Sequence, residues 1–139
     1  MNPSNLNWLA ILAATAAAFV IGFLWYGPIL GKAWMGATGL TEEKIAEGNM
    51  VRTFSLAFAF QLVMAFCLAM FFYTDPASAQ QVNAYSGAFY GFLTGFGWIA
   101  MALGVNALFE QRSFRYIAIN GGYWIVVFTT MGLILGAWN

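Results

Sequence analysis

Long apolar runs dominate the chain, and each is long enough to cross a bilayer. A hydrocarbon core about 30 Å thick needs on the order of 20 apolar residues in a helix. Runs of this kind occur four times, and all the Lys, Arg, Asp and Glu residues lie outside them. The runs are continuous, which excludes the alternating pattern of a β-barrel strand. The sequence therefore predicts four transmembrane helices, at residues 6–30, 53–73, 84–108 and 116–138.

Polar segments separate the runs and predict how the helices are connected. In the segment 31–52, Thr41 has the character of an N-cap, and Glu42 and Glu43 follow it in the first turn. We therefore expect a short surface helix that ends at a bend at Gly48–Asn49.

The remaining two connections are short. Asp75 and Pro76 predict a turn within residues 74–78, because the residue before a proline disfavours the helical conformation. Residues 109–115 are too few for anything but an antiparallel hairpin. Residues 1–5 carry no Lys or Arg, so we interpret the first run as a retained helix and not as a signal peptide. The predicted fold is all-α, a polytopic integral membrane protein in which residues 1–139 form one antiparallel four-helix transmembrane bundle.

Composition agrees with this class and excludes several functions. The chain is 62% hydrophobic and 7% charged, against roughly 25% charged residues in soluble domains. Its net charge of zero provides no field to attract nucleic acid. With no His and one Cys, no metal cluster, imidazole base or internal disulfide is expected. We expect no cofactor and no enzymatic activity, and we interpret Cys67 as a small packed hydrophobe.

Basic residues predict the orientation in the membrane. All five Lys and Arg residues fall in the segments 31–52 and 109–115, and none falls on the opposite side. Because basic flanks stay in the cytoplasm, we expect both segments to be cytoplasmic and both termini to be outside, in the cell (inner) membrane.

Small residues mark candidate packing faces. Helices in lipid associate through close packing, which favours small residues at every fourth position. The third run carries Gly87, Gly91 and Gly95 in one row. Such a row either packs the four helices of one chain together or contacts a second copy or another membrane subunit.

Uncharged polar residues form the other candidate site. Gln61 lies on the same helical stripe as Ala57 and Ala65, so it is expected to face the bundle interior. Amides in hydrocarbon need partners, so these groups either join helices by hydrogen bonds or line a polar pocket. The candidate lining residues, all in one leaflet, are Tyr26, Gln61, Asn106 and Asn120.

The rows of small residues that form packing faces are the strongest pattern in the sequence, so we expect an interaction or scaffold protein. It would form a homo-oligomer or serve as an accessory subunit of a membrane assembly. The alternative is a small channel or carrier for a neutral or weakly polar solute, lined by the four polar residues. An intramembrane enzyme ranks third, because no paired nucleophile and base is recognisable.

Several local motifs also point to a family. The end of the first run is the most specific, with Trp25-Tyr26-Gly27-Pro28 followed by Gly31-Lys32-Ala33-Trp34. Together with Asn7-Trp8-Leu9-Ala10, Leu40-Thr41-Glu42-Glu43 and the C-terminal Gly132-Leu133-Ile134-Leu135-Gly136, these motifs resemble the small membrane-protein family known as domain of unknown function 1761. The resemblance implies a four-helix integral membrane protein and implies no reaction, ligand or site residue.

Overall fold

The computed structural model describes residues 6–73 and 81–138, and all regular structure in those ranges is helical. Four helical segments are long and apolar enough to cross a membrane, and each end lies within one helical turn of the end expected from the sequence. The all-α, four-helix transmembrane class is therefore confirmed. The four segments are Trp8–Ile29, Met50–Phe72, Ala84–Phe109 and Phe114–Ala137.

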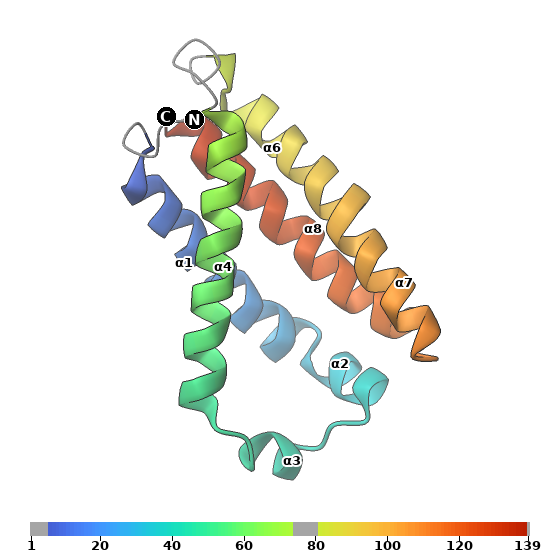
Figure 1. Cartoon of the computed structure of the whole chain (residues 1–139). Coiled ribbons are helices and arrows are strands. Elements are labelled where there is room, and N and C mark those ends of the chain that lie inside the picture. The colour runs from blue at the N-terminus through green and yellow to red at the C-terminus, as the bar shows by residue number, and fades with distance from the viewer. Residues whose placement is uncertain (1–5, 74–80, 139) are drawn as a thin grey trace.

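Two of the four segments contain a wide π-helical stretch. The first consists of α1 (Trp8–Leu24) and η2 (Trp25–Ile29), and it continues into α2 (Gly31–Thr38). The third consists of α6 (Ala84–Thr94), η3 (Gly95–Ala100) and α7 (Met101–Phe109). Figure 1 shows these elements together with α3 (Glu42–Ala46), α4 (Met50–Phe72) and α8 (Phe114–Ala137).

Polar caps explain where the long helices begin. The side chains of Asn7, Asn49, Asn83 and Ser113 each accept a hydrogen bond from a backbone N–H in the first turn of α1, α4, α6 and α8. Thr41 caps α3 in the same way, as its sequence predicts, and the chain bends at Gly48 before α4. The turn expected at 74–78 lies outside the described residues.

Helix α8 is central in the arrangement. It packs along α6 and η3 on one side and along α1 on the other, whereas α4 packs mainly against α1 and touches α8 less. The core accordingly joins α8 residues such as Val127 and Met131 to the alanine face of α1, which includes Ala14. Figure 1 shows α4 close to the other helices near the two chain ends and diverging from α6 and α7 toward α3. Helices α4 and α6 therefore contact each other little within the described residues.

The glycine row of α6 is used inside the chain. A Cβ atom at Gly91 would collide with the backbone carbonyl of Phe128, and one at Gly87 would collide with that of Gly132. At Gly95 it would lie 2.8 Å from the carbonyl oxygen of Trp124. Since these glycines let the backbones of α6, η3 and α8 touch, the row packs helices of one chain together, which is the first of the two alternatives that the sequence leaves open.

Both ends of the described chain lie on one side of the bundle. The side-chain amide of Asn7 donates a 2.9 Å hydrogen bond to the backbone carbonyl of Trp138. The connections between the first two and the last two helices lie at the opposite end (Figure 1). This geometry agrees with an antiparallel arrangement of four crossing helices.

Candidate functional site

Two of the candidate polar residues bond directly to each other. Tyr26 lies in η2, where Pro28 lacks the N–H that would bond to Leu24 and the helix widens, so that the Leu30 N–H donates to the Trp25 carbonyl. From this turn the Tyr26 hydroxyl donates a 2.6 Å hydrogen bond to Oδ1 of Asn120 on α8. The end of the first membrane segment is therefore attached to α8 by a side-chain bond.

A second connection joins three helices deeper in the bundle. Gln61 on α4 is 7% exposed, and its Nε2 donates a 3.0 Å hydrogen bond to the hydroxyl of Tyr123 on α8. That hydroxyl donates in turn to the backbone carbonyl of Ala18 on α1, at 3.1 Å. Gln61 Oε1 is buried and has no hydrogen-bond partner. Tyr123 therefore connects α8 to both α1 and α4 by hydrogen bonds.

Aromatic rings enclose these hydrogen bonds. The Tyr26 ring meets the rings of Tyr123 and Trp34 edge-on, with centroids 5.1 and 5.2 Å apart. The Trp25 indole donates a 3.0 Å hydrogen bond to the Ile119 carbonyl. Gly22 makes room for the tyrosine, because a Cβ atom there would lie 3.0 Å from the Tyr123 hydroxyl. The polar groups of this cluster are thus packed among rings and bonded to one another.

Asn106, the fourth polar candidate, lies outside this cluster. Asn106 is exposed on α7 and makes no side-chain hydrogen bond within the described residues, so it does not join Tyr26, Gln61 and Asn120. The four residues therefore do not line one common pocket. Cys67 is exposed on α4, which corrects our interpretation of it as a packed residue.

The chemistry available to this cluster is limited to hydrogen bonding. It contains hydroxyls, amides and a backbone carbonyl, with no carboxylate or basic side chain among its bonded members. In residues 6–73 and 81–138, no group of three or more His, Cys, Asp or Glu side chains is placed to hold a metal ion. The arrangement is suited to joining helices.

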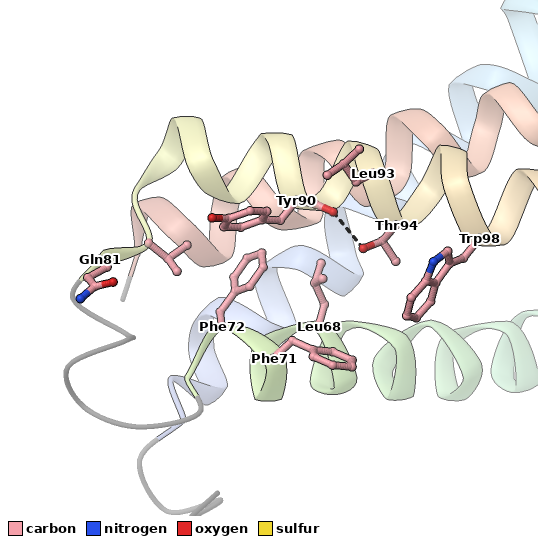
Figure 2. A pocket seen from close by; sticks show the side chains of 9 residues that line it. Leu68, Phe71, Phe72, Gln81, Tyr90, Leu93, Thr94 and Trp98 are labelled. Atoms are coloured by element: carbon pink, nitrogen blue, oxygen red, sulfur yellow. Dashed lines mark hydrogen bonds between the residues drawn. The ribbon is translucent and has the colours of Figure 1, made fainter.

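A groove of about 560 Å³ opens on the flank between α4 and α6. Figure 2 shows Leu68 and Phe72 of α4 pointing toward Tyr90 of α6, and Trp98 of η3 pointing toward α4. The rings of Phe72 and Tyr90, with centroids 6.1 Å apart, bring the two helices together at one end. The lining residues are Leu68, Phe71, Phe72, Gln81, Val82, Tyr90, Leu93, Thr94 and Trp98.

Sequence reasoning missed Tyr123 and the groove for different reasons. Tyr123 follows Asn120 by three residues and so shares its helix face, a signal that would have placed it among the polar candidates. The groove has no such signal, because its lining residues are mostly apolar like the rest of the spans, and the sequence does not specify the divergence of α4 from α6.

The comparisons place the chain in a family. The family model described as "Protein of unknown function (DUF1761)" matches residues 9–136. Neither a curated protein nor a solved structure matches the chain. Because the family model covers nearly all of the sequence and agrees with the motifs around Trp25 and Gly132, the chain belongs to the DUF1761 family.

Proposed function

We propose that this chain is an interaction protein of the membrane, and that it works by holding an apolar partner in the groove between α4 and α6. The observation that carries the proposal is the open flank of the bundle. The other helix pairs are closed by glycine or alanine contacts or by hydrogen bonds, whereas here facing apolar side chains leave about 560 Å³ unfilled. Second copies of the chain, other membrane subunits and lipids are all apolar enough to occupy it.

The polar cluster supports this choice over a channel or carrier. A conduit for a polar solute needs hydrogen-bonding groups that are free to contact the solute. Here Tyr26 and Asn120 bond to each other, Gln61 bonds to Tyr123, and Asn106 lies apart. An enzymatic role has no paired nucleophile and base in either the cluster or the groove to support it.

We further propose that the protein lies in the cell membrane with its termini outside. This assignment rests on the basic residues of the segments 31–52 and 109–115. Asn7 and Trp138, near the two ends of the described chain, lie together, and both basic segments lie at the other end of the bundle (Figure 1). Self-association or assembly as an accessory subunit would then use a surface other than the glycine row, which is already occupied by α8.

Spin labels at two matched positions test whether the groove holds a partner. Leu93 lines the groove and is 45% exposed, and Leu12 lies on α1 away from it and is 46% exposed. Each is replaced by Cys in a Cys67→Ala background, labelled with a nitroxide and reconstituted in membranes. A held partner makes the label at position 93 less accessible to oxygen than the one at position 12. Equal accessibility would contradict the proposal.

A further inference from the structure

Resting on the proposed function, we propose that the partner held between α4 and α6 is the acyl chain of a membrane lipid. We place its headgroup at the end of the groove marked by Gln81 and its tail toward Trp98 (Figure 2). Three features of the groove carry this assignment: the size of its side chains, its volume and the position of its polar groups.

The lining side chains are unsuited to a second helix. Helices in lipid pack through small residues that let their backbones approach closely. No Gly or Ala is among the groove's lining residues, which are mostly Leu, Phe, Tyr and Trp. The small residues are used inside the bundle instead, as in Ala14 and Ala69, which are fully buried, and Gly91, which meets α8. Bulky side chains with a gap between them suit a thin, flexible hydrocarbon chain.

The volume of the groove also favours an acyl chain. The lining of α6 and η3 reaches Trp98, which lies about 20 Å along the helix from Ala84 at about 1.5 Å per residue. The groove holds about 560 Å³, which lies within the range of roughly 300–1,000 Å³ for small-molecule sites.

The polar groups orient the lipid. Gln81 is exposed just before the start of α6, at the level where a span ends, and the Tyr90 hydroxyl points toward it (Figure 2). Neither side chain has a hydrogen-bond partner within the described residues. Amide and hydroxyl groups donate to the ester and phosphate oxygens of a headgroup. Farther along, the Thr94 hydroxyl donates a 2.8 Å hydrogen bond to the Tyr90 carbonyl, so it is not free to bind a polar group.

The headgroup site has no basic residue to select a charge. The sequence contains no Lys or Arg between Arg52 and Arg112, and both of these lie at the other end of the bundle. Zwitterionic and anionic phospholipids should therefore bind alike, and recognition should rest on the acyl chain and its ester groups.

A photoreactive lipid tests the assignment. The full chain is reconstituted in phosphatidylcholine vesicles containing a trace of phosphatidylcholine with a diazirine on one acyl chain, and labelled peptides are mapped after irradiation. Labelling should concentrate on the groove segments around Leu68 and Leu93. Leu93→Trp, which adds bulk to the groove lining, should lower it several-fold, and Gln81→Ala should lower it about fivefold, the factor for one lost hydrogen bond. Leu12→Trp, at a matched lipid-facing site, should leave it unchanged.

Even labelling of all exposed faces, unchanged by Leu93→Trp, would overturn the lipid assignment. The spin-label comparison at positions 93 and 12 separates this failure from failure of the proposed function. If position 93 is shielded while the lipid probe labels evenly, a protein occupies the groove and only the lipid assignment is wrong. If position 93 is not shielded and labelling is even, both proposals are wrong.

Discussion

The side-chain amide of Gln61 donates a 3.0 Å hydrogen bond to the hydroxyl of Tyr123. Because this hydroxyl also donates to the Ala18 carbonyl, one side chain connects α8 to both α4 and α1. The remaining acceptor, Gln61 Oε1, is buried without a partner. The two residues therefore contribute unequally to stability, and substitutions separate their contributions.

Tyr123→Phe should lower the free energy of unfolding by about 1–3 kcal/mol, because it removes both bonds and leaves the Gln61 amide unpaired. Gln61→Leu should cost less than about 1 kcal/mol, because it removes one bond and also an unsatisfied carbonyl. Adding Gln61→Leu to Tyr123→Phe should recover part of the loss. Unfolding in mixed detergent micelles measures all three, with Tyr85→Phe, at a residue 89% exposed, as control. Equal costs for the two single variants would contradict the assigned roles.

Two asparagines provide a matched test of the bond between η2 and α8. Asn120→Ala should destabilise the protein by about 1 kcal/mol, since Oδ1 of Asn120 accepts from the Tyr26 hydroxyl and interhelical bonds in membranes have about that value. Asn106→Ala should change stability little, because Asn106 is exposed. A double-mutant cycle with Tyr26→Phe should give a coupling energy with Asn120 and none with Asn106. If Asn106→Ala destabilised the protein more than Asn120→Ala, the result would contradict the structure and support the four-residue pocket.

The α6–α8 contact has its own matched pair of glycines. Gly91→Ala should destabilise the protein by about 1–3 kcal/mol or more, because the added methyl group collides with the backbone carbonyl of Phe128. At Gly97 nothing lies within 4 Å of an added Cβ, so Gly97→Ala should be neutral or stabilising by up to roughly 1 kcal/mol. Thermal unfolding in detergent measures both. Loss of an oligomer without loss of monomer stability in Gly91→Ala would return this row to an intermolecular role.

Topology is tested by a reporter fused after Trp138. The basic segments predict that this end is outside, so a reporter active only in the cytoplasm should be silent there. The same reporter inserted at residue 47 or 111 should be active. Activity at the C-terminal position, with silence at both loops, would reverse the proposed orientation.

The helices themselves could be predicted from the sequence because hydrophobic length is a strong signal. Four uncharged runs place each helix to within one turn, although α4 and α8 begin slightly earlier than predicted, at the caps Asn49 and Ser113. The interior position of Gln61 could also be predicted, because Gln61 shares a helical stripe with Ala57 and Ala65. These features depend on neighbours along one helix.

Contacts between helices were less predictable, because they depend on packing distances. The row from Gly87 to Gly95 fits a helix of the same chain or of another chain equally well, and only the position of α8 decides between them. Asn106 shares a leaflet with Asn120, but the orientation of α7 leaves it exposed. The groove likewise arises from the divergence of α4 from α6, which composition does not specify.

Native mass spectrometry of the gently extracted protein tests most directly whether the groove between α4 and α6 holds an apolar partner. We predict that the wild-type chain and Leu12→Trp carry a discrete added mass, that of one phospholipid, which is released on denaturation. Leu93→Trp, which adds bulk to the groove lining, should appear mainly as the bare chain. Wild-type protein that is bare, or an added mass retained equally by Leu93→Trp, would contradict the account.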